Sequence, residues 1–463
     1  MTDSVRDFDL AIIGTGSGNS LVTPDFDTSK VAVIESGTFG GTCLNVGCIP
    51  TKMFVYAAEV ANTVRQASRY GVDAHIDNIR WPDIRDRIFG RIDPISAGGL
   101  EYRRNGANTT TFLGRAEFTG PKSIRVDLGA GQLEQLTADQ VVIATGGRPV
   151  IPEVVSHSGV PFHTSETIMR IDALPPRLLI IGGGYIAAEF AHVFAGLGSA
   201  VTVIARGTSL LRQLDSEIAN RFTSVVAADW DLRLGVTVTK VSGASGEIRL
   251  DFSDGTTATG DALLVATGRV PNTDGLGLAA AGVETKTDGR IVVDQYGRTS
   301  APGIFTLGDV SSNYQLKHVA NHEARVVAHN LSHPGDLREF DHRFVPSAVF
   351  TSPQLASVGL TEDEVRGQGR NYRAVTQDYG DTAYGWAMED STGICKLIAD
   401  PDTGELLGAH LMGYQAANLI QPLIQAMSLG QRVPELARGQ YWIHPALMEV
   451  VENALLKLGL NPA

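Results

Sequence analysis

The stretch FDLAIIGTGSGN, residues 8–19, decides the fold of the first part of the chain. The apolar run Phe8–Ile13 is typical of a buried strand, and the glycine-rich turn Gly14–Asn19 follows it directly. In such a turn the first glycine permits a tight bend, and the second lets the backbone approach a pyrophosphate. The helix that follows binds the anion through its N-terminal N–H groups. The pattern therefore predicts a strand–turn–helix unit that binds a dinucleotide.

The residues around this turn strengthen the prediction. A second strand is expected at Val31–Ile34, and Glu35 at its end lies 21 residues after Gly14. A carboxylate at this place can accept hydrogen bonds from ribose hydroxyls. Asn19 stands where the motif has its third glycine, which loosens the motif without removing its phosphate-facing part. The candidate cofactor-binding residues of this unit are Gly14, Gly16, Ser17, Gly18 and Glu35.

The same unit occurs a second time. The apolar run Arg177–Ile181 ends in the turn Gly182–Ala187, and a helical stretch, Ala188–Leu197, leads to another strand, Ala200–Ile204. Two such units predict two dinucleotide-binding domains.

Arginine takes the place of the acid in the second unit, where the strand ends in Ala205-Arg206 and Arg212 follows six residues on. A carboxylate there would bind the ribose diol of NADH but repel a 2′-phosphate, whereas arginines form charge-assisted bonds to phosphate. The alternative is a pair of solvated surface arginines. We expect NADPH, with candidate binding residues Gly182, Gly184, Ile186, Arg206 and Arg212.

Each repeat closes in the same way. The strand-like runs Gln140–Ala144 and Ala262–Ala266 lead into nearly identical turns, ATGGRP at 144–149 and ATGRVP at 266–271. After about residue 336 strand-like stretches are followed by helical ones, which suggests an α+β domain. The expected fold class is therefore α/β, with two Rossmann-like domains and an α+β C-terminal domain. The expected elements of that last domain are strands Ala348–Phe350, Gly393–Ala399 and Leu406–Met412, and helices Ala416–Leu429 and Pro445–Leu458.

Cys43 and Cys48 are candidates for redox chemistry. The chain has three cysteines, too few for a secreted disulfide framework, and these two precede an expected helix at Pro50–Val64. A helix N-terminus stabilises a thiolate, which lowers its pKa and makes it reactive. A zinc site would need further cysteines at suitable spacing, so no metal is predicted. Cys395, in an apolar run, is expected in the core.

A histidine near the C-terminus has a carboxylate within reach. His444 is expected to open the helix Pro445–Leu458, and Glu449, five residues on, can fix the tautomer and orientation of the ring. Most His–Glu pairs at this spacing have a structural role. The pair indicates catalysis only in combination with the two cysteines.

The charge and hydropathy of the chain argue against several kinds of binding partner and cellular location. A net charge of −13 argues against nucleic acid or an anionic membrane as the main partner. No run of about 18 apolar residues occurs, so no membrane span is expected. The acidic start, Met1–Asp9, runs directly into a strand and leaves no room for a signal peptide. These features predict a cytoplasmic protein.

Together these residues resemble the pyridine nucleotide–disulfide oxidoreductase family, which includes glutathione reductase and dihydrolipoamide dehydrogenase. The resemblance covers essentially the whole chain, and its most specific stretch is GGTCLNVGCIPTK, residues 40–52. It implies an FAD-binding domain at 1–150 and 271–335, an NADPH-binding domain at 151–270 and a dimerisation domain at 336–463. Residues 306–309, Thr-Leu-Gly-Asp, are similar to the family's second FAD element.

The resemblance also implies a mechanism. NADPH reduces FAD on one ring face, and the flavin reduces the Cys43–Cys48 disulfide on the other. Cys48 is then the flavin-side thiolate, and Cys43 attacks the substrate disulfide. His444, held by Glu449, moves the proton and is supplied by the partner subunit of a homodimer with shared active sites.

Further residues match the family position by position. Lys52, paired with Glu189, is implied to lie near flavin N5, and Tyr185 to cover the nicotinamide pocket. The remaining cofactor-binding residues of the match are Gly41, Thr42, Thr145, Gly146, Gly268, Gly308 and Asp309.

The sequence does not decide which disulfide is the substrate, and it leaves other members of the family as alternatives. The segments at 14–19, 316–322 and 440–447 resemble one branch of the family, which acts on a small thiol disulfide. Lys317-His318 stand where most members have Thr-Pro, which disfavours a glutathione reductase. The resemblance implies that the two residues lie near the flavin, with an effect on the cofactor rather than on substrate choice, and it assigns neither of them a specific role. Dihydrolipoamide dehydrogenase, which uses NAD, and a glutathione-type reductase remain alternatives. Mercuric and large thioredoxin reductases would need C-terminal cysteines or selenium, whereas this chain ends in Leu460–Ala463.

A flavin-binding redox sensor is the alternative that is not an enzyme. Retention of His444 and Glu449 favours turnover, because a sensor need not return protons to a leaving thiol.

Overall fold

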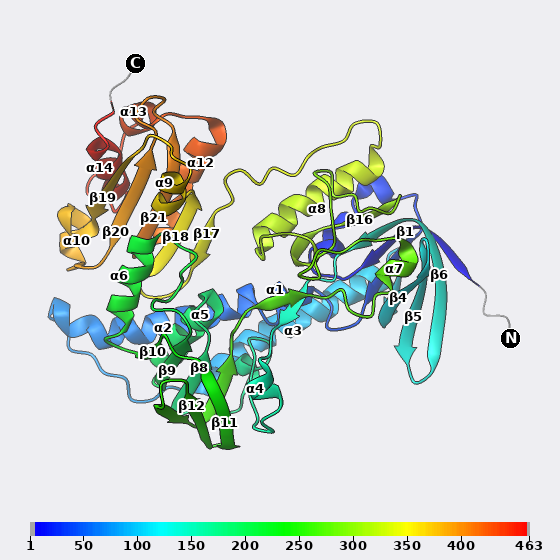
Figure 1. Cartoon of the computed structure of the whole chain (residues 1–463), viewed down its shortest axis with the longest axis horizontal. Helices are drawn as coiled ribbons and strands as arrows, with labels where there is room; N and C mark the ends of the chain where they lie inside the picture. Colours follow the sequence, from blue (N-terminus) through cyan, green and yellow to red (C-terminus); the bar gives the residue numbers. More distant parts are fainter. Residues whose placement is uncertain (1–4, 461–463) are drawn as a thin grey trace.

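The computed structural model describes residues 5–460 of the chain. Residues 1–4 and 461–463 lie outside the described residues, and with them parts of the expectations about the acidic start and the C-terminal end. Figure 1 shows three bodies: the sheet that contains β1 and β6 on the right, the sheet that contains β8 and β9 at the lower left, and the C-terminal sheet at the upper left.

The first body is built on a seven-stranded sheet in the order β3-β2-β1-β6-β5-β4, with β16 beside β6. Strands β3, β2, β1, β6 and β16 are parallel, while β4 and β5 form an antiparallel meander with the first half of β6. The late strand β16 shows that the chain returns to its first sheet after the second body. The strands are β1 Arg6–Ile13, β2 Val31–Glu35, β3 Thr109–Leu113, β4 Arg115–Gly120, β5 Ser123–Gly129, β6 Gln132–Ile143 and β16 Ile304–Thr306.

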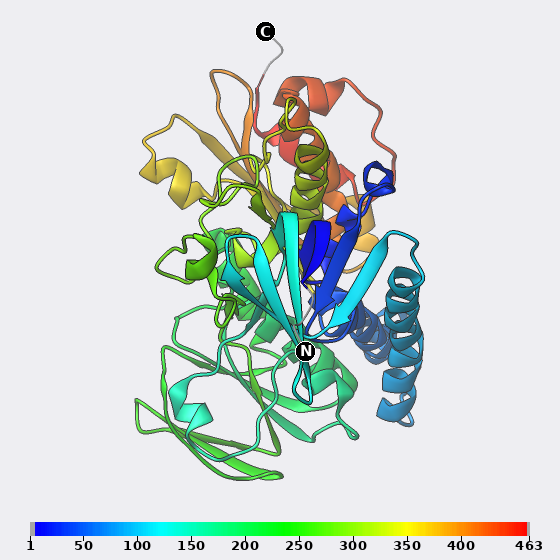
Figure 2. The ribbon, with the colours of Figure 1, turned by 90° about the vertical axis from the view of Figure 1, so that its right-hand side faces the viewer.

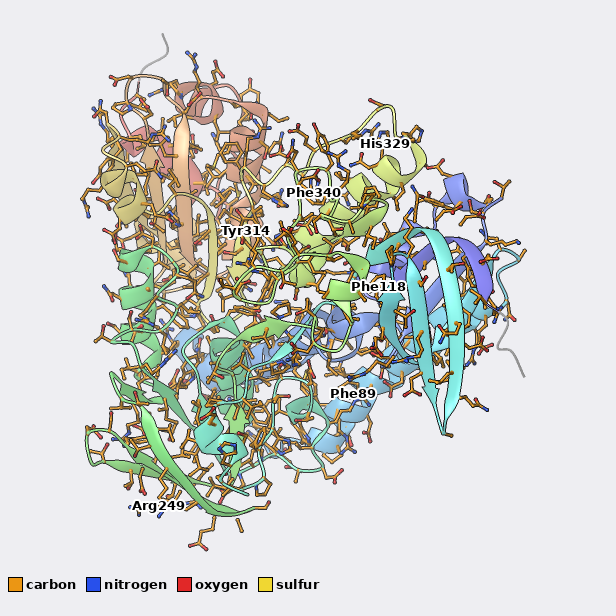
Figure 3. All side chains as sticks on the ribbon, turned by 45° about the vertical axis from the view of Figure 1, so that its right-hand side comes forward. Phe89, Phe118, Arg249, Tyr314, His329 and Phe340 are labelled. Atoms are coloured by element: carbon orange, nitrogen blue, oxygen red, sulfur yellow. The ribbon has the colours of Figure 1, made fainter. Side chains whose placement is uncertain are left out.

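Burial explains why β1 and β2 have near-continuous apolar sequences. Residues 10–13 and 31–34 are all buried, because helices and loops cover both faces of the parallel sheet. Phe118 of β4, labelled in Figure 3, belongs to the core on one face. The helices of this body are α1 Gly41–Asn45, α2 Cys48–Gln66, α3 Trp81–Arg104, α7 Leu278–Ala281 and α8 Lys317–Ser332.

The second body repeats the parallel arrangement on a smaller scale. Its four-stranded sheet has the order β10-β9-β8-β14, all parallel, and a three-stranded antiparallel sheet, β11-β12-β13, lies beside it. Its strands are β8 Arg177–Ile181, β9 Ala200–Ala205, β10 Asp231–Leu234, β11 Val238–Ala244, β12 Glu247–Phe252, β13 Thr257–Gly260 and β14 Ala262–Val265. Its helices are α4 Glu153–Ser156, α5 Tyr185–Leu197 and α6 Ser216–Val226.

The two matching turns that close the repeats are joined to each other. Strand β7 (Gly147–Pro149) pairs antiparallel with β15 (Arg269–Pro271). On one side the Thr145 hydroxyl donates to Asn272 O at 2.8 Å, and on the other the Thr267 hydroxyl donates to Val150 O at 2.8 Å. This short ladder fixes the second body against the first.

The C-terminal body has a five-stranded antiparallel sheet in the order β17-β18-β21-β20-β19, with helices packed on it. Figure 2 shows it above the first sheet, with the second body below. The strands are β17 Ser347–Val349, β18 Gln354–Gly359, β19 Arg373–Asp378, β20 Ile394–Ala399 and β21 Leu406–Gly413. The helices are α9 Glu362–Gly367, α10 Ala383–Ala387, α11 Ala416–Leu419, α12 Gln421–Leu429, α13 Val433–Arg438 and α14 Glu449–Lys457. Cys395 is fully buried in β20, as predicted.

The predicted fold class is confirmed, but the first glycine turn differs from expectation. It is followed by a short 3-10 helix, η1 (Ser17–Leu21), and not by an α-helix. Pro24 explains this, because it has no N–H and its ring disfavours the helical conformation of Thr23. The expected anion-binding helix is therefore reduced to a single turn.

Two C-terminal expectations also need correction. The predicted helix Ala416–Leu429 is two helices that meet at Ile420. His444 does not open a helix: α14 begins only at Glu449, because the backbone N–H of Ala446 donates to the Glu449 side chain and the chain turns there. In the described part of the chain, no helix is long and apolar enough to cross a membrane.

Candidate active site

A cavity of about 1230 Å³ is lined by residues of all three bodies. Far-separated parts of the chain meet in it, including both cysteines and the first glycine turn. The predicted site residues that line it are Gly14, Gly16, Ser17, Glu35, Gly41, Thr42, Cys43, Cys48, Lys52, Thr145, Gly146, Tyr185, Ile186, Glu189, Gly308 and Asp309.

Gly14 and Gly18 of the first turn, and Gly41 beside it, leave no space for a side chain. Gly14 has φ +105°, and a Cβ on it would lie 2.3 Å from Ala144 O. Gly41 has φ +70°, and its Cβ would lie 2.6 Å from Gly16 Cα. Gly18 packs against Ala144 Cβ in the same way, at 2.9 Å. The turn and the start of α1 are thus held together so closely that a ligand can approach bare backbone.

Glu35 is held at the end of β2 by the turn itself. Its carboxylate accepts from Thr15 N at 2.9 Å, from the Thr15 hydroxyl at 2.5 Å and from Gly37 N at 2.8 Å. Thr15 is fully buried and was not predicted as a site residue, since no motif marks a threonine at this position. The carboxylate stays at the cavity wall with lone pairs left for ribose hydroxyls.

Cys43 and Cys48 lie on two successive helix starts. Cys43 is in α1, and Cys48 is the first residue of α2, with Gly47 between the helices. A Cβ on Gly47 would lie 2.9 Å from Thr42 O, so this link needs glycine. Both thiols are free in the structure. Cys48 stands at a helix start as predicted, but the pKa that is lowered is that of Cys43.

The two thiols titrate as a coupled pair. The pKa of Cys43 is lowered from 9.0 to about 7, chiefly because the Cys48 thiol donates a hydrogen bond to it, with the nearby Lys317 ammonium helping against burial. The pKa of Cys48 is raised, because its hydrogen bond to Cys43 and its burial both hold the proton. The pair therefore loses one proton easily and keeps the second.

The expected ion pair between Lys52 and Glu189 is not formed. The ammonium of Lys52 lies 3.8 Å from Glu59 Oε1 and 4.2 Å from the centre of the Phe350 ring. Glu189 instead accepts from the backbone N–H of Phe350 at 3.0 Å. Glu59 is on the same helix as Lys52 and attracts its ammonium group. Glu189 is on α5, which places it beside the loop that follows β17. Burial raises the pKa of Glu189 to about 7.

The second predicted FAD element begins at the end of β16, two strands from β1 in the same sheet. Gly308 N donates to the buried carboxylate of Glu323 at 2.6 Å, and His342 Nε2 lies 3.0 Å from the other oxygen of that carboxylate. Tyr314 and Phe340, both labelled in Figure 3, pack their rings against His342. Next to Gly308, burial raises the pKa of Asp309, with Arg269 opposing. Glu323 was not predicted, and it fixes the backbone that presents Asp309.

The second glycine turn repeats the geometry of the first. Gly182 has φ +144°, and a Cβ on it would lie 2.2 Å from Ala266 O. Gly184 caps α5, which begins at Tyr185, and burial raises the pKa of Tyr185 to about 12. Gly268, with φ +124°, stands in the turn of the second repeat, where Gly146, with φ +65°, stands in the first.

Arg206 and Arg212 lie side by side at the end of β9. Both are exposed, and the guanidinium of Arg212 folds over Gly207, with its Nε 2.4 Å from where a Cβ would be. Neither forms an ion pair with a carboxylate among the described residues. Two free guanidinium groups at this strand end leave their donors available to a phosphate.

His444 and Glu449 do not line the cavity of their own chain. His444 Nδ1 lies 2.7 Å from Glu449 Oε1, and its side chain is 70% exposed. Glu449 Oε2 also accepts from Ala446 N at 3.2 Å, so the carboxylate is fixed before it orients the ring. The neighbouring Tyr441 and Ile443 are exposed as well, at 103% and 76%. The pair is preorganised, but it lies outside the cavity that contains its own cysteines.

These residues fit a flavin dinucleotide. The closely packed glycine turn suits a pyrophosphate, Glu35 suits a ribose, and Asp309 in the same cavity suits a polyol chain. When bound, FAD would supply the electron transfer between nicotinamide and the cysteine pair.

Comparison with known proteins supports the assignment of this cavity as a flavin site. Residues 8–324 match the family described as pyridine nucleotide-disulphide oxidoreductase, and residues 345–455 match its dimerisation domain. The chain is 57% identical over 460 residues to mycothione reductase of Mycobacterium tuberculosis (strain ATCC 25618 / H37Rv), covering 97% of this chain and 99% of that protein. It is 34% identical over 449 residues to glutathione reductase of Burkholderia cepacia, covering 96% and 97%.

A solved structure shows the same fold. The HOCl-induced flavoprotein disulfide reductase RclA from Escherichia coli superposes with a TM-score of 0.85 at 28% identity, covering 97% of this chain and 99% of that one. The predicted FAD and NADPH are thereby confirmed as cofactors. The chain belongs to the pyridine nucleotide-disulphide oxidoreductase family, as an FAD-dependent enzyme that uses NADPH to reduce a disulfide.

Proposed function

We propose that this enzyme reduces mycothione, the disulfide of mycothiol, to the free thiol. The observation that carries the proposal is the 57% identity to mycothione reductase over 97% of the chain. The segments at 14–19, 316–322 and 440–447 support it, since they resemble that enzyme in particular. The family match alone would leave a glutathione-type or lipoamide substrate open.

The cysteine pair carries the substrate chemistry in this proposal. The Cys43 thiolate attacks one sulfur of the substrate disulfide, forms a mixed disulfide and displaces one thiolate. The Cys48 thiol then loses its proton, which goes through His444 to the second leaving thiolate, and its sulfur attacks the Cys43 sulfur. This restores the Cys43–Cys48 disulfide and releases the second thiol. Two electrons pass from the dithiol to the substrate, and NADPH returns them through FAD.

His444 supplies the proton for the leaving thiolate. Glu449 accepts from Nδ1, which leaves Nε2 to face the substrate and stabilises the protonated ring. Because His444 is exposed and outside its own cavity, we infer that it acts in the cavity of the partner subunit. The dimerisation domain of the family supports a homodimer with such shared sites.

The other predicted site residues keep their proposed roles. We propose that Arg206 and Arg212 bind the 2′-phosphate of NADPH, and that the domain segments are 1–150, 151–270, 271–335 and 336–463. A cytoplasmic location is proposed because a dithiol fed by NADPH belongs in a reducing compartment.

The proposed substrate is tested by following NADPH oxidation with mycothione, glutathione disulfide and lipoamide at equal concentrations. We expect steady turnover with mycothione and much slower turnover with the other two. A preference for either of the others overturns the proposal. A single equivalent of NADPH consumed, with no turnover on any disulfide, would instead favour a redox sensor.

The proposed phosphate site is tested by replacing Arg206 and Arg212 with Ala. Each hydrogen bond to a charged group contributes roughly 1.5–3 kcal/mol, so the double variant should bind NADPH at least about tenfold more weakly. KM for NADH should stay the same. An unchanged ratio of NADPH to NADH efficiency contradicts the assignment.

A further inference from the structure

Lys317 was expected near the flavin, but the sequence did not say what it does there. It is the first residue of α8, and its Nζ donates to the hydroxyl of Ser17, 300 residues earlier, at 2.8 Å. Ser17 also lies 3.4 Å from Asn321 Oδ1, one turn further along α8. Ser17 belongs to the glycine turn that suits the FAD pyrophosphate. The ammonium of Lys317 therefore lies at the phosphate end of the cavity.

This turn lacks the helix that would normally neutralise a pyrophosphate. A full α-helix contributes about half a positive charge and several free N–H groups at its start. Here η1 has five residues, and Thr23-Pro24 prevent its extension. A 3-10 turn of this length has a much smaller dipole, so the charge on a bound pyrophosphate needs another counterion.

Arg103 of α3 does not provide that charge. It is buried, and both of its bonds go to Asn19, from Nε to Oδ1 at 2.7 Å and from Nη2 to the backbone O at 2.7 Å. These bonds pair the backbone carbonyl of Asn19 and its side-chain oxygen with one arginine. They give Asn19 a structural role at the position where the motif has its third glycine. The N–H side of the turn, which faces the cavity, receives nothing from Arg103.

Three other cations that line the cavity already face carboxylates: Lys52 faces Glu59, Arg148 faces Asp274 and Arg269 faces Glu166. Arg115 also lines it but is exposed. Lys317 has a hydroxyl as its partner, and no ion pair with a carboxylate among the residues described. A lysine at a helix N-terminus is also repelled by the helix dipole, and no acid stands in the first turn of α8. The Asp309 carboxylate and the Cys43 thiol are close enough to feel this charge, but neither forms an ion pair with it. A bound anion beside the Ser17 hydroxyl would stabilise the ammonium.

We propose that Lys317 neutralises the pyrophosphate of bound FAD, in place of the helix that this chain lacks after its first glycine turn. Ser17 fixes the ammonium beside the turn, and Asn321 fixes Ser17. Lys317 is thus a cofactor-binding residue that takes no part in proton transfer. The inference rests on FAD as the cofactor and is independent of which disulfide is reduced.

The experiment compares FAD retention in the purified holoenzymes of wild type and Lys317→Met. Free FAD is measured by its fluorescence after serial dilution, at several KCl concentrations. We expect the variant to hold FAD about 10- to 100-fold more weakly, the loss of one strong charged contact. Salt should weaken FAD binding in the wild type more than in the variant, because the ion contact is screened. Lys317→Arg should retain most of the affinity. Lys240→Met, on the exposed strand β11, is the matched control and should change nothing.

Lys317 is also close enough to the cysteines to help lower the pKa of Cys43, and the same variants separate this role. If Lys317→Met holds FAD as tightly as the wild type, the proposal is overturned. In that case a higher pH midpoint of the thiolate absorption band would assign Lys317 to the cysteine pair. A variant that folds, by circular dichroism, but purifies without flavin supports the proposal. If Lys317→Met does not fold, Lys317→Gln against Lys317→Arg gives the same comparison.

Discussion

Cys43 and Cys48 divide their protons unequally, and the division has a measurable consequence. Because the pKa of Cys43 is lowered to about 7, a thiolate forms as the pH rises through about 7, well below the usual range of a thiol. In the NADPH-reduced enzyme, iodoacetamide should therefore label Cys43 faster than Cys48, with a rate that rises through this pH. Mass spectrometry of the modified peptides gives the site, and the pH dependence of the rate gives the pKa. Labelling mainly at Cys48, or a midpoint near 9, would contradict the assignment.

Glu189 makes stability depend on pH in a known direction. Burial raises its pKa from 4.5 to about 7, so between these values the folded chain keeps a proton that the unfolded chain has lost. The extra proton on Glu189 stabilises the folded state at low pH. This contribution to the free energy of unfolding is lost as the pH rises from about 4.5 to 7. Its size is at most roughly 3 kcal/mol, and less because the side chain borders the open cavity.

Glu189→Gln removes this titration and keeps an oxygen for the Phe350 N–H. We expect the variant to equal the wild type in thermal stability at pH 5 and to exceed it at pH 8, measured by calorimetry with FAD bound. Identical pH profiles for the two proteins would show that Glu189 has an ordinary pKa.

At the scale of elements, the contact between the first turn and α1 depends on Gly41. Its φ of +70° costs an alanine about 1–2 kcal/mol, and the added Cβ would lie 2.6 Å from Gly16 Cα, where backbone must shift. Gly41→Ala should separate the turn from α1 and lower the FAD content, read from the ratio of flavin to protein absorbance. Gly90→Ala in α3 is the control, since its Cβ meets nothing within 4 Å and a helix prefers alanine. Full FAD content in Gly41→Ala would show that the turn tolerates the shift.

At the scale of the whole molecule, the sequence predicted what local patterns determine. The strand Arg177–Ile181 and the turns after β1 and β8 follow from apolar runs and glycines, whose signals lie within a few residues. The absence of an α-helix after the first turn was missed, because Thr23-Pro24 lie beyond the glycine motif. The partner of Lys52 was predicted wrongly, because Glu59 on the same helix lies within ion-pair distance of its ammonium. The contact of Lys317 with Ser17 spans 300 residues and exists only in the assembled fold.

The predicted acid–base pair, His444 and Glu449, lies outside the cavity of its own chain. His444 belongs to the C-terminal body, it is exposed, and it does not line the cavity that holds Cys43. Exposed Tyr441 and Ile443 beside it provide apolar surface that a second copy would cover. We expect each subunit of the dimer to place this segment against the cavity of the other subunit. Each cavity then contains the cysteines of one chain and His444 of the other.

Complementation tests this arrangement directly. Cys43→Ser and His444→Ala subunits, each inactive alone, are mixed under conditions that exchange subunits, and heterodimers are quantified with distinct affinity tags. In a heterodimer with shared sites, one cavity combines intact cysteines with an intact His444. Random pairing makes half of the dimers mixed, so activity should return to about a quarter of the wild-type value. Mixing Cys43→Ser with Cys48→Ser is the control, because no cavity in that heterodimer regains both thiols. If heterodimers of the first pair form and stay as inactive as the control, His444 does not act across the interface, and its exposed position must have another cause.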